Sequence, residues 1–127
     1  MREFTFNRDT KETKISIKIN LDGSGVNKID TGIAFFDHML QQISTHSLID
    51  LDLTCDGDLK VDMHHTVEDV GIALGESIKN ALGDKKGITR FGYSYVSFDE
   101  TLTRSVIDLC NRPVFYLECK NIIRKSW

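Results

Sequence analysis

A helical period that runs from residue 64 to residue 82 constrains the fold of this chain most. Apolar residues recur there at intervals of three and four, which predicts one long helix with a single buried stripe. The stripe comprises Val67, Val70, Gly71, Leu74, Ile78 and Leu82. Gly83 suits the end of this helix because glycine readily adopts the conformation of a C-terminal cap. Such a helix needs a sheet or another helix to cover its apolar face.

Two alternations of apolar and polar residues predict strands, at residues 14–21 and 49–55. A turn at residues 22–25 and a short segment at residues 26–29 predict an antiparallel return strand after the first. A second helix is predicted at residues 33–46, with an apolar stripe of Phe36, Met39, Leu40 and Ile43. A turn at residues 56–58 and a short strand at residues 59–61 would lead into the long helix. Residues 8–13 read only as a polar lead-in to the first strand.

Three more strand-like runs follow the long helix, at residues 91–98, 102–110 and 114–119. No helical pattern follows them, so their apolar faces lack a predicted cover. The order of elements predicts an α+β fold. It consists of one strand-and-helix half-unit, an antiparallel sheet covered by helices, and the first strands of a second half.

The composition is that of a soluble globular protein of one domain. Its 127 residues include 16 Lys and Arg against 19 Asp and Glu, a net charge of −3, and no long basic run. The electrostatic footprint of nucleic-acid binding is therefore missing. No run approaches the roughly 18 apolar residues of a membrane span, and the first residues lack the apolar stretch of a signal peptide. We expect a cytoplasmic protein without nucleic-acid or membrane partners.

Histidines and a carboxylate gather near the start of the long helix. At about 100° per residue, His64, His65 and Glu68 fan over the flank beside the apolar stripe. Imidazole nitrogen and carboxylate oxygen are the ligands that borderline divalent metals take. Because adjacent histidines diverge, they would serve two ions more easily than chelate one. The alternative is that all three are ordinary polar residues of a first helical turn.

Five other polar residues have no decisive local pattern. His38 falls nearly opposite the apolar stripe of its own helix and so faces water or another surface. His46 ends that helix, where its charge suits the helix dipole. Arg90 and Arg112 flank the C-terminal strands, where they could hold an anion bidentately or be plain surface residues. Glu12, in the polar lead-in, reads locally as a solvated charge.

Several motifs at consistent spacing resemble the imidazoleglycerol-phosphate dehydratase family, in order from about residue 4 to residue 117. They are Thr10-Lys11-Glu12-Thr13, Asp22-Gly23, Thr31-Gly32-Ile33, Phe36-Asp37-His38-Met39-Leu40, Gly57-Asp58-Leu59, His64-His65-Thr66-Val67-Glu68-Asp69, Gly71-Ile72-Ala73-Leu74-Gly75, Arg90-Phe91-Gly92, Asp99-Glu100 and Arg112-Pro113. A single short motif would carry little weight. The number of matches makes chance resemblance implausible.

The resemblance implies a hydro-lyase of histidine biosynthesis that dehydrates imidazole glycerol phosphate to imidazole acetol phosphate. It implies manganese, two ions per complete site, and a homo-oligomer whose sites lie between subunits. The implied metal ligands are His38, His64, His65 and Glu68. The implied acid–base group, also in contact with the substrate, is Glu12. The implied further substrate-binding residues are His46, Arg90 and Arg112.

The family also resembles two similar halves that each carry an HHxxE stretch, and this chain supplies only the first. We expect one family-like domain over residues 1–127: a first half at 1–85, an incomplete second half at 86–119, and a divergent tail at 120–127. The chain would then be a C-terminally truncated member. The alternative function is a non-catalytic fragment that binds metal weakly or only assembles with intact subunits. A metalloprotease-like hydrolase is disfavoured because its motif, HExxH, has a different order.

Overall fold

The computed structural model describes residues 1–118. Its chain divides into two compact units, Met1–Lys85 and Lys86–Trp127. All fully buried side chains of the described residues belong to the first unit. The first unit therefore holds the hydrophobic core.

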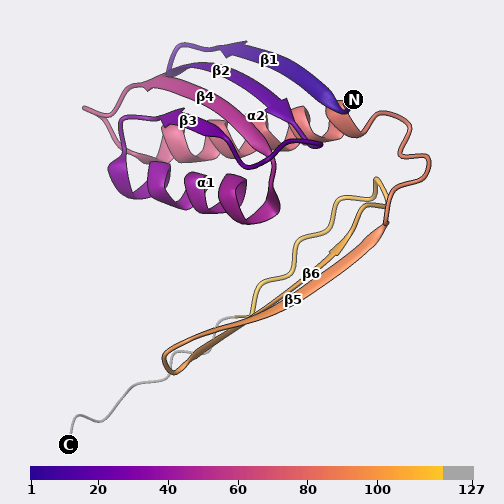
Figure 1. Ribbon diagram of the computed structural model, residues 1–127. Coiled ribbons are helices and arrows are strands. Elements are labelled where there is room, and N and C mark those ends of the chain that lie inside the picture. The colour runs from indigo at the N-terminus through magenta and orange to yellow at the C-terminus, as the bar shows by residue number, and fades with distance from the viewer. Residues whose placement is uncertain (119–127) are drawn as a thin grey trace, which may run out of the picture. The chain divides into compact units, whose positions relative to one another are not determined.

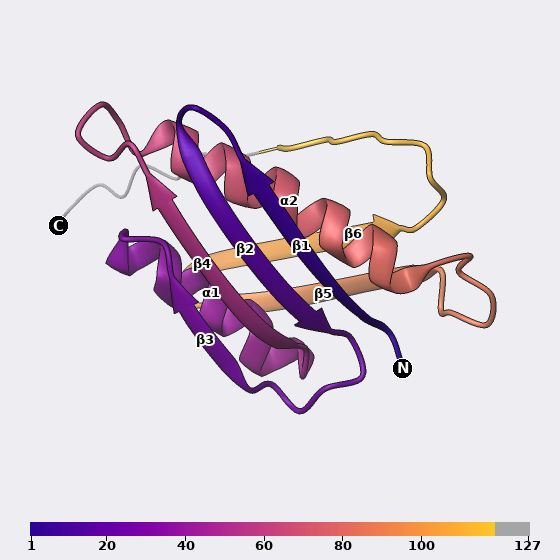
Figure 2. The ribbon, with the colours of Figure 1, turned by 90° about the horizontal axis from the view of Figure 1, so that it is seen from above.

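Four strands form the sheet of the first unit, in the order β1-β2-β4-β3 (Figures 1 and 2). They are β1 (Glu3–Asp9), β2 (Thr13–Asn20), β3 (Asn27–Asp30) and β4 (Asp50–Gly57). The strands predicted from alternation are confirmed as β2 and β4. The predicted antiparallel sheet is wrong in one respect, because β3 pairs with β4 in parallel while the other pairs are antiparallel.

The return strand predicted after residues 22–25 is β3, and the prediction is wrong in both its partner and its direction. The chain leaves β3, passes through helix α1 (Ala34–Ser47) and re-enters the sheet as β4, between β2 and β3. Parallel strands need a long crossover connection, usually a helix, which α1 provides. A short segment carries no local signal for which strand it will join.

Two other local predictions are wrong. Residues before the first predicted strand form β1, whose Phe4 and Phe6 pack half-buried against the core. Residues 59–61 form no strand, because the chain turns there: the Leu59 N–H donates to the Gly57 carbonyl and the Val61 N–H to the Asp58 carbonyl. This turn joins β4 to the long helix.

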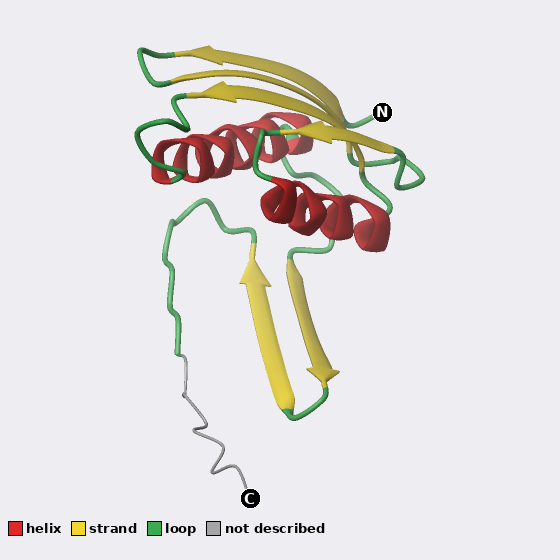
Figure 3. Cartoon of the chain, turned by 90° about the vertical axis from the view of Figure 1, so that its left-hand side faces the viewer, coloured by secondary structure: helices red, strands yellow, loops and turns green. Residues whose placement is uncertain are grey.

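Both helices cover the same face of the sheet (Figures 1 and 3). Helix α1 packs on β3 and β4, and helix α2 (His64–Leu82) packs on β1, β2 and β4. The two predicted helices are confirmed to within one residue at each end. None of the helices in residues 1–118 has the length and apolar character needed to cross a bilayer.

The buried stripe of α2 differs from the predicted one. Its buried residues are Thr66, Asp69, Val70, Ala73, Ser77 and Ala81. Val67 is 42% exposed, and Leu74 and Ile78 are only partly buried. Small side chains face the sheet because they let helix and sheet approach closely, so the larger ones lie at the flanks. The buried stripe of α1 also differs from the predicted one, because its buried residues are Leu40 and Ser44.

The core lies between the sheet and the helices. Its largest contributors come from the two central strands, Ile15, Ile17 and Ile19 of β2 with Leu51 and Leu53 of β4, each at most 4% exposed. Burial of such side chains contributes roughly 1.5–3 kcal/mol each. The opposite face of the sheet carries the polar residues of the same strands.

The second unit contains an antiparallel hairpin, β5 (Phe91–Phe98) and β6 (Thr101–Asp108), whose residues are all exposed. These two strands are confirmed. The strand predicted at residues 114–119 is wrong for residues 114–118, which are irregular, because an apolar run makes a strand only where another strand can pair with it. Residue 119 and the predicted tail at residues 120–127 lie outside the described residues.

Candidate active site

Two junctions of the first unit bring predicted site residues together. Glu12 lies in the turn between β1 and β2, and His65 lies in the first turn of α2. The Nε2 atom of His65 lies 3.9 Å from Oε1 of Glu12. The predicted acid–base group and one predicted metal ligand therefore face each other.

Hydrogen bonds fix the backbone around Glu12. The Thr10 hydroxyl accepts the N–H groups of Glu12 at 3.1 Å and Thr13 at 3.0 Å, so the side chain of Thr10 closes the turn. The carbonyl of Glu12 accepts the N–H of Asp58 at 3.0 Å, which ties the turn to the end of β4. The Glu12 side chain itself is 52% exposed and free to meet a substrate.

A buried ionic network anchors α2 to the same turn. The hydroxyl of Thr13 donates to Oδ2 of Asp69 at 2.5 Å, and Nη1 of Arg8 lies 2.5 Å from the same oxygen. The hydrogen bond from Thr13, aided by Arg8, holds the pKa of Asp69 below its usual value. This network joins β1, β2 and α2, and so sets the position of the helix that carries the histidines.

Gly57 allows close contact between β4 and α2. A Cβ atom at this position would lie 2.0 Å from Oγ1 of Thr66 and 3.7 Å from Cγ2 of Thr13. Only glycine leaves room for the first turn of α2 to pack against the end of the strand. The distance between His65 and the Glu12 turn depends on this packing.

The imidazole of His65 is held on its other side by Asp58. Its Nδ1 lies 3.0 and 3.1 Å from the two carboxylate oxygens. This hydrogen bond, together with the nearby negative charges of Asp58, Glu12 and Asp62, raises the pKa of His65 above its usual value, although partial burial acts in the opposite direction. Asp58 therefore fixes the orientation of the His65 imidazole. The His65 side chain is 29% exposed.

His64 and Glu68 form a second donor pair on the surface of α2. Nε2 of His64 lies 3.1 Å from Oε2 of Glu68, with 71% and 55% of the two side chains exposed. The rings of His64 and His65 are 6.1 Å apart between centroids and inclined by 68°. The two imidazoles therefore point to different places, as the sequence predicted.

The remaining predicted residues belong to other parts of the chain than these pairs. His38 is exposed on α1, in agreement with its predicted position off the buried stripe, and His46 contacts Gln42 through Nε2 at 3.0 Å in the last turn. In the second unit, Nε and Nη2 of Arg90 donate to the Asp108 carboxylate at 2.6 and 3.1 Å. Arg112 is exposed. The predicted roles of these four residues stay predictions.

The donor set suits a divalent metal in kind. His64 with Glu68, and His65 with Glu12, each pair a nitrogen with a carboxylate oxygen, the ligand types that such ions take. In number it falls short: residues 1–118 contain no group of three His, Cys, Asp or Glu side chains that could hold a metal ion.

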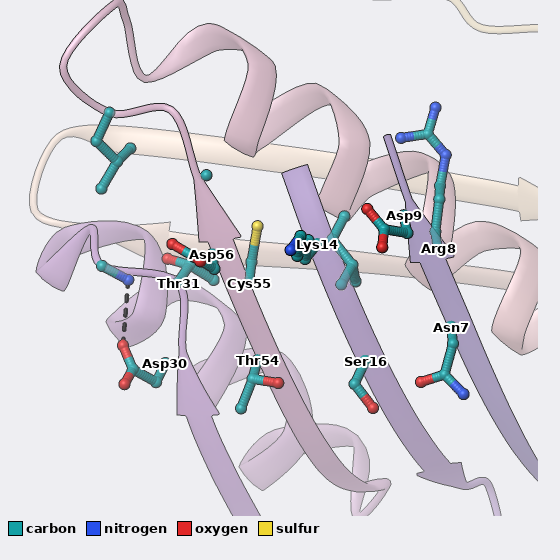
Figure 4. Close-up of a pocket in the computed structure, with 14 residues that line it drawn as sticks. Asn7, Arg8, Asp9, Lys14, Ser16, Asp30, Thr31, Thr54, Cys55 and Asp56 are labelled. Carbon is teal, nitrogen blue, oxygen red and sulfur yellow. Dashed lines mark hydrogen bonds between the residues drawn. The ribbon is translucent and has the colours of Figure 1, made fainter. Parts of the chain in front are cut away.

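A shallow hollow of about 650 Å³ lies over the polar face of the sheet (Figure 4), and Arg8 and Gly57 are among its lining residues. Asp9, Lys14, Ser16, Thr54 and Asp56 are among its lining residues. None of the predicted site residues lines it. Its chemistry is that of a solvated sheet face, so the histidine junction remains the candidate site.

Sequence reasoning did not single out Arg8, Thr13, Asp58 and Asp69 as supports of the site. Thr13, Asp58 and Asp69 stand inside motifs that carry the family resemblance, which was the one available signal. Arg8 carried none, since nothing in a polar lead-in shows that its guanidinium will be buried against a helix.

The family model for imidazoleglycerol-phosphate dehydratase matches residues 31–126. The chain belongs to this family. The imidazoleglycerol-phosphate dehydratase of Akkermansia muciniphila is 64% identical over 113 residues, which are 89% of this chain and 58% of that one. The Neisseria gonorrhoeae protein of the same name is 58% identical over 112 residues, 88% of this chain and 37% of that one.

Solved structures agree with the family. The crystal structure of imidazoleglycerol-phosphate dehydratase from Staphylococcus aureus subsp. aureus N315 superposes with a TM-score of 0.76 at 31% identity, covering 94% of this chain and 67% of that chain. The predicted α+β fold is thereby confirmed. The chain spans about 37% to 58% of the length of these two curated imidazoleglycerol-phosphate dehydratases.

Proposed function

We propose that this chain carries the first part of a metal-dependent active site that dehydrates imidazole glycerol phosphate to imidazole acetol phosphate. Family membership supports the dehydratase chemistry and its place in histidine biosynthesis. The observation that carries the proposal is the facing pair of Glu12 and His65, held from three sides by the β1–β2 turn, the end of β4 and α2. A preorganised acid–base group beside an imidazole donor is what this reaction needs.

The reaction removes the hydroxyl group from the carbon attached to the imidazole ring of the substrate and a C–H proton from the next carbon, and the enol that results tautomerises to the ketone. A bound divalent metal, proposed to be manganese, supplies Lewis-acid stabilisation of charge on that ring. The residues that would hold it are His64, His65, Glu68 and, from α1, His38. Because residues 1–118 assemble no three-donor group, we propose that further copies of the same chain complete each site.

Glu12 is proposed to move the proton. Its carboxylate is exposed enough to meet the reacting carbon, while its backbone is fixed by Thr10 and Asp58. Arg90 and Arg112 are proposed to bind the phosphate, for which a planar guanidinium is well suited. The ion pair of Arg90 with Asp108 uses two of its five N–H donors.

The test is formation of imidazole acetol phosphate by the purified 127-residue chain with added Mn²⁺, against a sample treated with chelator. We expect turnover that the chelator abolishes, and a loss of at least about 100-fold in kcat/KM in Glu12→Gln. Asp56→Asn, on the polar face of β4, is the control for removing a carboxylate charge and should keep wild-type activity. A folded, inactive wild-type chain would overturn the proposal and leave the non-catalytic fragment as the function.

A further inference from the structure

Asp58 is hydrogen-bonded to both His65 and the backbone of Glu12. Its carboxylate accepts from Nδ1 of His65 through both oxygens, at 3.0 and 3.1 Å. Its N–H donates to the Glu12 carbonyl at 3.0 Å. One residue thus connects the two groups of the candidate site that face each other.

The surroundings of Asp58 hold it rigidly. It follows Gly57, which is paired with Thr13 in the ladder between β2 and β4. Its own carbonyl accepts the Val61 N–H at 2.7 Å, so both sides of its backbone are hydrogen-bonded. With 28% of its side chain exposed, the carboxylate has little freedom to leave the imidazole.

This contact decides which nitrogen of His65 carries the proton. An ionised carboxylate only accepts hydrogen bonds, so Nδ1 must be the donor and, in the neutral ring, Nε2 keeps its lone pair. Nε2 is the nitrogen that faces Glu12, at 3.9 Å. A neutral imidazole with its lone pair directed outward is ready to bind a cation.

We propose that Asp58 is a positioning residue: it holds His65 with the proton on Nδ1, presents Nε2 to a divalent cation, and sets the separation of His65 from Glu12. The proposal rests on the metal-dependent function proposed above. A carboxylate behind a ligating imidazole fixes its tautomer and orientation and strengthens it as a donor. His64 serves as an internal comparison, because its Nε2 faces Glu68 at 3.1 Å and its side chain is 71% exposed.

The test uses the full chain as wild type, Asp58→Ala, Asp58→Asn and the charge control Asp56→Ala. Nitrogen-15 NMR of the histidine rings reports the tautomer without any metal. We expect the Nδ1–H tautomer for His65 in the wild type and Asp56→Ala, and a shift toward Nε2–H in Asp58→Ala, with His64 unchanged. Asp58→Asn keeps the size of the side chain and a weaker hydrogen-bond acceptor, so it should shift the His65 tautomer less than Asp58→Ala does. It also provides a second variant in case Asp58→Ala fails to fold.

Titration with Mn²⁺ alone is the second measurement. We expect affinity to fall by roughly 10–100-fold in Asp58→Ala and by less in Asp58→Asn, while Asp56→Ala binds like the wild type. An unchanged tautomer, an unchanged affinity, or a wild-type chain that takes up no Mn²⁺ overturns the proposal.

The two proposals fail in different ways. If the tautomer and Mn²⁺ affinity respond to Asp58 but the wild type forms no product, the positioning role stands and the dehydratase function of this chain does not. If the wild type is active and the Asp58 variants bind Mn²⁺ as tightly as the wild type, the function stands and the positioning role is wrong.

Discussion

Single residues set the spacing of the candidate site, and Gly57 is the clearest case. Gly57→Ala would place a Cβ 2.0 Å from the Thr66 hydroxyl, so β4 and α2 would have to separate. We expect a loss of about 1–3 kcal/mol in the free energy of unfolding, as for other overpacked sites. Urea unfolding would measure it. Thr66→Ala in the same chain removes the hydroxyl and should restore part of the loss; a stable single variant would contradict the close approach.

Asp50 shows how one carboxylate holds a loop and makes stability depend on pH. Its Oδ1 accepts hydrogen bonds from the N–H groups of Ser24 at 2.8 Å and Val26 at 2.9 Å. These two bonds, Ser24 first and Val26 second, lower the pKa of Asp50 below 3.8. A lowered pKa in the folded state adds stability above the unfolded value, and that contribution is lost as pH falls through the folded value.

Asp50→Asn should therefore be less stable than the wild type at neutral pH, and the difference should shrink below pH 3.8. Urea unfolding midpoints, measured from neutral pH down to about pH 2, would check this. Asp52→Asn, on the exposed face of the same strand, removes an equal charge and is the matched control. A gap that is constant with pH would show that Asp50 acts through size or shape and not through its charge.

At the scale of elements, the two sides of α2 differ in the space that they leave for side chains. Its sheet-facing side is built from small residues, while a Cβ at Gly71 or Gly75 would meet nothing within 4 Å. Glycine inside a helix is less favourable than alanine by roughly 0.5–1 kcal/mol, so Gly71→Ala and Gly75→Ala should each stabilise the chain by about that amount. Thermal unfolding would measure the gain. Ala73→Leu, on the sheet-facing side, should destabilise; loss of stability in both glycine variants would mean that this face is packed against another molecule.

At the scale of the whole molecule, stability resides in the first unit. The buried side chains of residues 1–118 all lie in Met1–Lys85, whereas β5 and β6 are exposed, and a lone two-stranded hairpin is marginally stable in water. We expect residues 1–85 alone to unfold cooperatively at nearly the same temperature as the full chain. Circular dichroism on both would check this, and an unfolded 1–85 fragment would show that the first unit depends on the rest of the chain.

Local periodicity predicted β2, β4, β5, β6, α1 and α2 well, because the direction of each side chain along a helix or strand is a property of the nearby backbone. It failed where the outcome depended on a distant partner. Leu59 and Val61 predict a strand where the structure has a turn, and β1 carries little strand signal because only Phe4 and Phe6 among its residues are apolar.

By itself, the sequence determined the helical and strand periods, the family, and the presence of His64, His65 and Glu68 in the first turns of one helix. Only the tertiary structure decided that β3 pairs in parallel with β4, that Ala73 and not Val67 faces the sheet, and that Asp58 meets both His65 and Glu12. The reason is physical: a period needs only neighbouring residues, whereas pairing, depth of burial and hydrogen bonds such as that of Thr13 with Asp69 join groups that meet only after the chain has folded.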